Sequence, residues 1–137
     1  MKKLDIYKKL RSSGLRPTKQ RVEIAKFLFE REKTFHFTVE SLNKLLAKKV
    51  SSKFALATVY NTVHAFKDAG HLNEVEVKGN KTYFDTNTSN HHHFLDINTN
   101  ELIDLKNEDV HNIKIKKRIP GKKINSIEVL VKIENSN

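Results

Sequence analysis

The stretch from residue 56 to residue 85 constrains the fold most strongly, because an amphipathic helix is followed directly by a β-hairpin. Apolar side chains at three- and four-residue intervals predict one apolar helix face, formed by Leu56, Val59, Val63 and Phe66. Gly70 ends this helix. Two β-prone runs, 73–77 and 82–85, then flank Lys78-Gly79-Asn80-Lys81, whose Gly-Asn pair is typical of a hairpin turn.

Three further helices are predicted before this segment. One spans residues 4–13 and stops at Gly14. A second begins near Thr18, whose hydroxyl can accept an unpaired N–H group of the first helical turn, and a third begins at Thr38. Four helices followed by a basic hairpin is the order of a winged helix-turn-helix, whose last helix enters the major groove of DNA. A small α/β domain with a merely hydrated polar helix face is the alternative.

The polar face of the fourth helix and the charge of the chain both favour a polyanionic partner. This face carries hydrogen-bond donors where a surface helix usually mixes Glu and Lys: Thr58, Tyr60, Asn61, His64 and Lys67. The chain has 26 Lys and Arg against 16 Asp and Glu. Through Asp85 the ratio is 18 to 9, and beyond it 8 to 7. Biased codon usage explains abundant lysine but not why the excess ends near Asp85, so we expect double-stranded DNA to bind the first half.

The second half changes character and predicts a small, mostly β dimerisation domain. Strands are expected at 91–95 and 101–105, and a clearer one at 127–133, where Ile127, Val129, Val131 and Ile133 alternate with polar residues and Leu130 is the exception. Three short strands bury too little surface to be stable alone, so we expect a homodimer. The predicted fold class is α+β, with a winged helix-turn-helix over 1–85 and a small α/β dimerisation and sensing domain over 86–137.

Three consecutive histidines, His91, His92 and His93, are the strongest candidate ligand group. On a strand His91 and His93 face one side and His92 the other. Asp85 precedes them, and His36 lies just before the third helix. Imidazole with carboxylate suits Fe(II), Mn(II) or Zn(II), and imidazole alone suits haem iron. A surface loop and a pH-responsive element are the alternatives.

The composition excludes several classes of protein. The chain has no cysteine, which excludes disulfides, Cys-ligated zinc, iron–sulfur clusters and thiol catalysis. It shows no long apolar run and no signal peptide, so a cytoplasmic protein without a membrane partner is expected. A phosphate loop, a nucleophile elbow and a His-Glu-x-x-His motif are all absent, so an enzyme is not expected.

Several spaced motifs resemble the ferric uptake regulator family. They are Gly14-Leu15-Arg16-Pro17-Thr18-Lys19-Gln20-Arg21, the run Leu56-Ala57-Thr58-Val59-Tyr60-Asn61-Thr62-Val63, and Phe66-Lys67-Asp68-Ala69-Gly70. The resemblance covers roughly residues 10–110. The run from Lys81 to Thr88, followed by three histidines without a cysteine pair, is most similar to the iron response regulator branch. That branch is described as responding to haem or iron status.

The resemblance implies two ligand sites. The family's hinge site, between the DNA-binding and dimerisation halves, corresponds to His36, Asp85, His92 and Asp104. Its second site corresponds to His91, His93 and His111. Phe94 replaces a further hinge histidine, and the late histidine of the second site is missing. The resemblance to the iron response regulator branch therefore favours haem at the histidine cluster.

The predicted function is an iron- or haem-responsive transcriptional regulator, mainly a repressor, that binds operator DNA as a dimer. The alternatives are an Fe-, Mn- or Zn-dependent regulator of the same family and a DNA-binding module without a regulatory ligand. The residues expected at DNA are Arg16, Thr58, Tyr60, Asn61, Lys67 and Lys81. Asn61 stands where the family more often has arginine.

Overall fold

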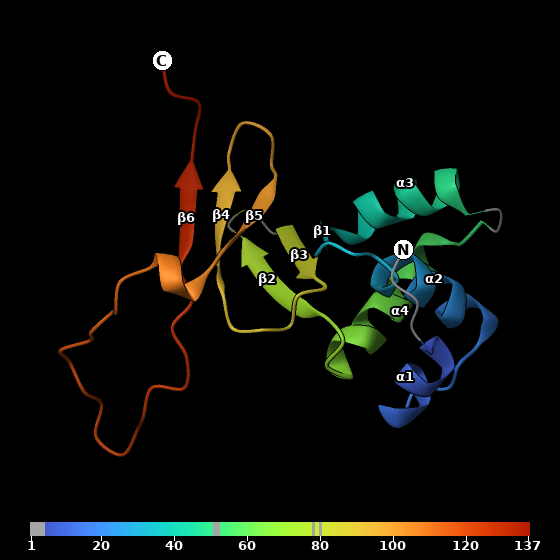
Figure 1. Ribbon diagram of the computed structural model, residues 1–137, viewed down its shortest axis with the longest axis horizontal. Helices are drawn as coiled ribbons and strands as arrows, with labels where there is room; N and C mark the ends of the chain where they lie inside the picture. Colours follow the sequence, from blue (N-terminus) through green and yellow to red (C-terminus); the bar gives the residue numbers. More distant parts are fainter. Residues whose placement is uncertain (1–4, 51–52, 78, 80) are drawn as a thin grey trace. The chain divides into compact units, whose positions relative to one another are not determined.

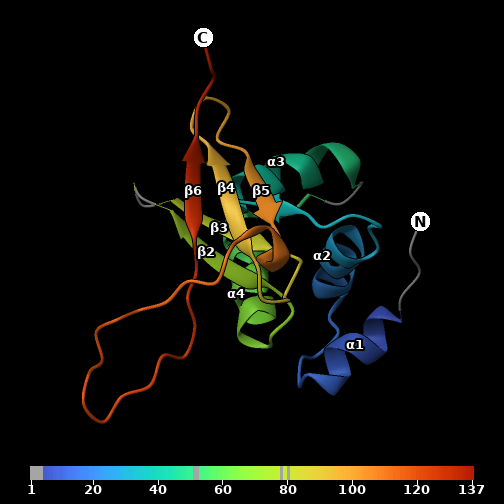
Figure 2. The same cartoon turned by 60° about the vertical axis from the view of Figure 1, so that its left-hand side comes forward.

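The computed structural model divides into two compact units, Met1–Thr88 and Ser89–Asn137. It describes residues 5–50, 53–77, 79 and 81–137 (Figures 1 and 2). The start of the first predicted helix at Leu4 and the turn positions Lys78 and Asn80 lie outside the described residues. The fold is α+β, as predicted.

The first unit contains all four predicted helices: α1 (Ile6–Ser12), α2 (Lys19–Phe29), α3 (Val39–Lys49) and α4 (Leu56–Asp68). The predicted cap at Thr18 is confirmed, and Thr38 caps α3 in the same way. The Thr18 hydroxyl accepts the Arg21 N–H at 3.2 Å, and the Thr38 hydroxyl accepts the Ser41 N–H at 3.1 Å. The Ser41 hydroxyl in turn accepts the Thr38 N–H, which completes a capping box. Local hydrogen bonding thus fixes where α2 and α3 begin.

A three-stranded antiparallel sheet completes the first unit. Its strands are β1 (His36–Phe37), β2 (Asn73–Val77) and β3 (Lys81–Asp85), in the order β1-β3-β2. The hairpin of β2 and β3 was predicted, whereas β1 was not, because a two-residue strand carries no periodicity. The core beneath the helices includes Phe37, Phe66 and Phe84, all fully buried. Side-chain packing therefore anchors both β1 and β3 to α4.

The second unit is a three-stranded sheet of β4 (His92–Asp96), β5 (Leu102–Leu105) and β6 (Leu130–Ile133), in the order β5-β4-β6. β4 runs antiparallel to β5 and parallel to β6. A single turn of 3-10 helix, η1 (Asn107–Asp109), follows β5. The turn before β5 has Asn100 at φ 62°, and the Asp96 carboxylate accepts the Asn98 N–H there.

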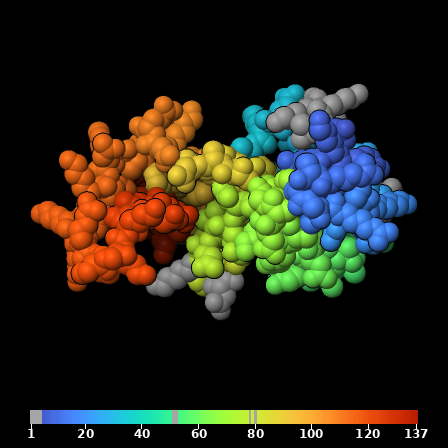
Figure 3. Space-filling view, turned by 90° about the horizontal axis from the view of Figure 1, so that it is seen from below, coloured from blue at the N-terminus to red at the C-terminus, as the bar shows by residue number. Residues whose placement is uncertain are grey.

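The last predicted strand is shorter than expected. β6 begins at Leu130, so residues 127–129 lie outside it, and Leu130 is half-buried on the same face as exposed Lys132. At this point the Val129 N–H donates to the His92 ring at 3.0 Å rather than to a β4 carbonyl, while the Val129 carbonyl accepts the His93 N–H at 3.1 Å. Residues 110–129, orange to red in Figure 3, form no helix or strand, and five of their isoleucines are exposed.

Candidate metal centre and DNA-binding surface

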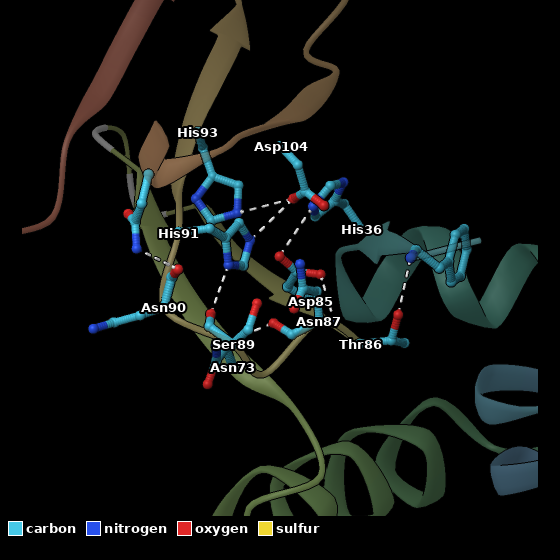
Figure 4. A network of polar contacts seen from close by, with 12 residues as sticks. His36, Asn73, Asp85, Thr86, Asn87, Ser89, Asn90, His91, His93 and Asp104 are labelled. Carbon is cyan, nitrogen blue, oxygen red and sulfur yellow. Dashed lines mark hydrogen bonds and ion pairs between the residues drawn. The ribbon is translucent and has the colours of Figure 1, made fainter. Parts of the chain in front are cut away.

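In the first unit, β1 and β3 place His36 directly opposite Asp85. The His36 Nε2 lies 3.1 Å from Asp85 Oδ2 (Figure 4). The Asp85 carboxylate is fully buried, and its other oxygen, Oδ1, accepts the Asn87 N–H at 2.8 Å. This backbone bond orients the carboxylate and leaves Oδ2 directed at the imidazole, as expected of a supported metal ligand. His36 and Asp85 are therefore brought together as predicted.

In the second unit, two imidazoles converge on one carboxylate. The Nε2 atoms of His91 and His93 lie 3.0 and 3.5 Å from Oδ1 of Asp104 (Figure 4). His93 and Asp104 are direct partners across β4 and β5, so their side chains share a face. The two rings also contact one another, with centroids 4.5 Å apart. We call His91, His93 and Asp104 the β4–β5 triad.

The hydrogen bonding of His91 shows that the triad suits a cation. Its Nδ1–H donates to the Ser89 carbonyl oxygen at 2.7 Å. A neutral ring then has only a lone pair at Nε2, which faces the Asp104 oxygen at 3.0 Å. Two lone pairs repel at this distance unless a proton or a metal ion lies between them. A carbonyl on the far ring nitrogen is also the usual partner of a metal-ligating histidine.

The distances fit a divalent metal ion. Two ligand atoms bound at right angles, each about 2.1 Å from an ion, lie about 3 Å apart. The contacts of 3.1 Å in the His36–Asp85 pair and of 3.0 Å between His91 and Asp104 match this spacing. Two imidazoles and one carboxylate on one face also form the ligand set of many non-haem Fe(II) sites. The triad therefore offers three ligand atoms, and the His36–Asp85 pair two, of the kinds that Fe(II), Mn(II) and Zn(II) accept.

His92 and His111 lie apart from the triad. His92 pairs with Leu105 rather than Asp104, and its Nδ1 accepts the Val129 N–H. Its ring therefore stabilises the start of β6. Asp104, which the resemblance grouped with His92, instead lies with His91 and His93. His111 is exposed and outside this cluster. Strand alternation predicted that His91 and His93 share a side, but it did not predict which carboxylate they would contact.

The polar face of α4 presents the predicted DNA-contacting residues. Tyr60 is 52% exposed, and Asn61 is exposed beside it. Arg16, Thr58 and Asn61 line a common hollow of about 370 Å³. The remaining lining residues were not predicted: Thr18, Gln20, Arg21 and Thr62. The Arg21 guanidinium donates to the Arg16 carbonyl oxygen at 3.1 Å and so fixes the loop before α2. The sequence could have indicated Gln20 and Arg21, because both follow the Thr18 cap in the first turn of α2.

The two predicted lysines differ in their surroundings. Lys81 is exposed at the start of β3. The Lys67 ammonium lies 3.4 Å from an Asp68 oxygen and 3.7 Å from a Glu74 oxygen. These two carboxylates offset its charge, which weakens its case as a phosphate ligand.

The described residues contain no helix long and apolar enough to cross a membrane. A four-helix unit with a hairpin wing is the arrangement of winged helix-turn-helix DNA-binding proteins, and here it is followed by a unit that brings imidazole and carboxylate side chains together. This combination fits the class of metal-responsive transcription regulators. Comparison with known proteins agrees with this class.

The model of the ferric uptake regulator family matches residues 12–132. The ferric uptake regulation protein of Rhizobium leguminosarum bv. viciae is 33% identical over 98 residues, which cover 71% of this chain and 67% of that protein. The peroxide-responsive repressor PerR of Staphylococcus epidermidis is 32% identical over 96 residues, 70% of this chain and 62% of the relative.

A solved structure of the Pseudomonas aeruginosa ferric uptake regulator with manganese superposes with a TM-score of 0.71 at 22% identity. The superposition covers 98% of this chain and all of that one, and it shows a shared fold. The chain belongs to the ferric uptake regulator family. Members of this family are transcription regulators rather than enzymes.

Proposed function

We propose that this chain is a divalent-metal-dependent transcriptional repressor that binds operator DNA as a homodimer. The single observation that carries the proposal is the β4–β5 triad, in which two imidazole nitrogens and a carboxylate oxygen meet within metal-ligand distances. The His36–Asp85 pair adds a second group of the same chemistry in the DNA-binding unit. Iron, manganese and zinc are the candidate ions, since all three accept mixed imidazole and carboxylate ligands.

The geometry favours a divalent ion over haem, which the resemblance to the iron response regulator branch implied. An axial haem ligand needs an imidazole whose free nitrogen faces an open space for the porphyrin. The Nε2 atoms of His91 and His93 instead point at Asp104 Oδ1. In His92, Nδ1 is engaged by the Val129 N–H. Haem binding would require this arrangement to open, so hemin is the second ligand to be tested.

The proposed mechanism follows from where the ligands sit in the chain. The His36–Asp85 pair belongs to the DNA-binding unit and the triad to the proposed dimerisation unit. As the resemblance implies, a ligand in the hinge between the DNA-binding and dimerisation halves would fix the spacing of two recognition helices in the dimer. The ion can stabilise the DNA-binding form only by binding it more tightly than other forms.

The test is operator binding by the purified protein at fixed salt, without ligand and with Fe(II), Mn(II), Zn(II) or hemin. We expect one divalent ion to increase affinity at least about fivefold, the lower end of common coupling free energies. The variants His91→Ala and His93→Ala should lose this increase. Equal DNA binding with and without every metal would refute the metal-dependent proposal. A response to hemin alone would establish the haem alternative.

Separate measurements test the proposed dimer and the proposed DNA-binding surface. Sedimentation should give twice the mass of the 137-residue chain. If a dimer neutralises about six to ten phosphates, its affinity should fall about a thousandfold or more between 50 and 200 mM salt. A salt-independent affinity would exclude the DNA-binding function, and a monomer would exclude two-half-site recognition.

A further inference from the structure

An aromatic stack links the exposed face of α4 to the buried strand β3. His64 lies between two rings, with its centroid 4.2 Å from that of Tyr60 and 5.5 Å from that of Phe84. Tyr60 and His64 are four residues apart on one helix, which places them one above the other. Tyr60 is half-exposed, His64 partly buried and Phe84 fully buried. The stack therefore runs from the solvent-facing surface of α4 into the core of the first unit.

The inner end of this stack adjoins the His36–Asp85 pair. Phe84 stacks on Phe37 with centroids 5.8 Å apart, and the two are direct partners across β1 and β3. The neighbouring partners in the same register are His36 and Asp85. Whatever fixes the His36–Asp85 pair therefore also fixes the backbone positions from which both phenylalanines project.

We propose that His64 is a positioning residue that orients Tyr60 and couples that orientation to metal binding at His36 and Asp85. The inference rests on the proposed function, because it assumes a divalent ion at this pair. Buried Phe84 cannot reorient freely in a close-packed core, so it gives the His64 ring a fixed support. The His64 ring in turn restricts Tyr60, whose phenol is the large exposed aromatic group of the α4 surface.

The contact energies set the size of the expected effect. Aromatic pairs contribute enough beyond their buried area to change a binding constant about threefold to tenfold. His64→Ala removes both ring contacts at a partly buried helix position and introduces the best helix former, so the fold should be retained. His64→Phe keeps a ring of similar size and serves as the matched control. If His64 only covered the core, either His or Phe would fill that role, and the orientation of Tyr60 would not depend on metal.

The direct readout is ¹⁹F NMR of the full chain labelled with 3-fluorotyrosine. The chain contains only three tyrosines, and Tyr60→Phe identifies the Tyr60 signal. Tyr7 on α1 lies outside the stack and is the internal reference. Zn(II) is diamagnetic, so a shift on its addition reports conformation rather than paramagnetism. We expect Zn(II) to shift the Tyr60 signal in the parent chain and in His64→Phe, but not in His64→Ala.

Operator affinity gives the second readout. In His64→Ala the Zn(II)-induced gain in affinity should be reduced about threefold or more, and in His64→Phe it should be retained. Calorimetry separates the two proposals. If Zn(II) does not bind the parent chain, the proposed function fails. If Zn(II) binds but the Tyr60 signal stays fixed, or shifts equally in His64→Ala, the coupling role is overturned while the metal-dependent function stands.

Discussion

Asp104 is the residue at which the metal-site geometry can be tested most sharply. Its Oδ1 is the common neighbour of two imidazole nitrogens, at 3.0 and 3.5 Å. Asp104→Asn keeps the shape of the side chain but removes its negative charge. Loss of groups that merely support a ligand commonly weakens metal affinity about 10- to 100-fold. Loss of the only carboxylate in the triad should therefore raise the Kd for Zn(II) about 100-fold or more, a change of about 2.7 kcal/mol.

Thermal unfolding measures this loss of Zn(II) affinity as a smaller rise in Tm on adding Zn(II). With free Zn(II) at 100 times the parent Kd, binding stabilises the parent chain by about 2.7 kcal/mol. The same concentration equals the expected Kd of the variant and stabilises it by about 0.4 kcal/mol. At about 4 °C per kcal/mol, Zn(II) should raise the Tm by about 10 °C in the parent and about 2 °C in Asp104→Asn.

Asp109→Asn is the matched control, because it makes the same chemical change at an exposed carboxylate of the same unit, outside the triad. Isothermal titration with Zn(II) should give a parent-like Kd for this variant. An unchanged Kd in Asp104→Asn, or an equal loss in Asp109→Asn, would show that the triad does not hold the ion.

Three smaller changes test other parts of the molecule. Thr38→Ala should lower the free energy of unfolding by about 1 kcal/mol in urea, since the α3 cap loses its hydroxyl, whereas Thr38→Ser should not. The pKa of His71 is lowered by burial and by Lys9, so the unfolded chain binds more protons just below pH 6.5. Stability should therefore be complete above that pH and fall below it, and this fall should shrink in His71→Asn. Arg16→Ala should reduce the slope of log affinity against log salt by about 2, one for each protomer of the dimer, while Lys67→Ala, already offset by two carboxylates, should change it little.

The helices of the first unit were predictable because their signals are local. The apolar stripe of α4 lies within the helix itself, and the threonine caps of α2 and α3 directly precede the helices that they begin. The strand β1 is different, because its two residues are ordered only by pairing with β3, 49 positions along the chain at His36 and Asp85. Pairing over such distances leaves no periodic signal, so the position of His36 before the third helix suggested a ligand, and only the resemblance assigned it to a particular site.

The three consecutive histidines have different partners, and the sequence pattern predicts only part of this difference. Alternation places His91 and His93 on one side of β4, but their partner depends on the register that sets His93 opposite Asp104. The tautomer of His91 depends on the Ser89 carbonyl, two residues before it. His92 faces away, and its ring takes the Val129 N–H that a continuous strand would have donated to β4. The same three-residue run therefore contributes two candidate metal ligands and the residue that determines where β6 begins. The His92 ring on one side of β4 accepts the Val129 N–H at the start of β6, while the His91 and His93 rings on the other side converge on Asp104. β4 therefore links the candidate sensing site to the start of the C-terminal strand.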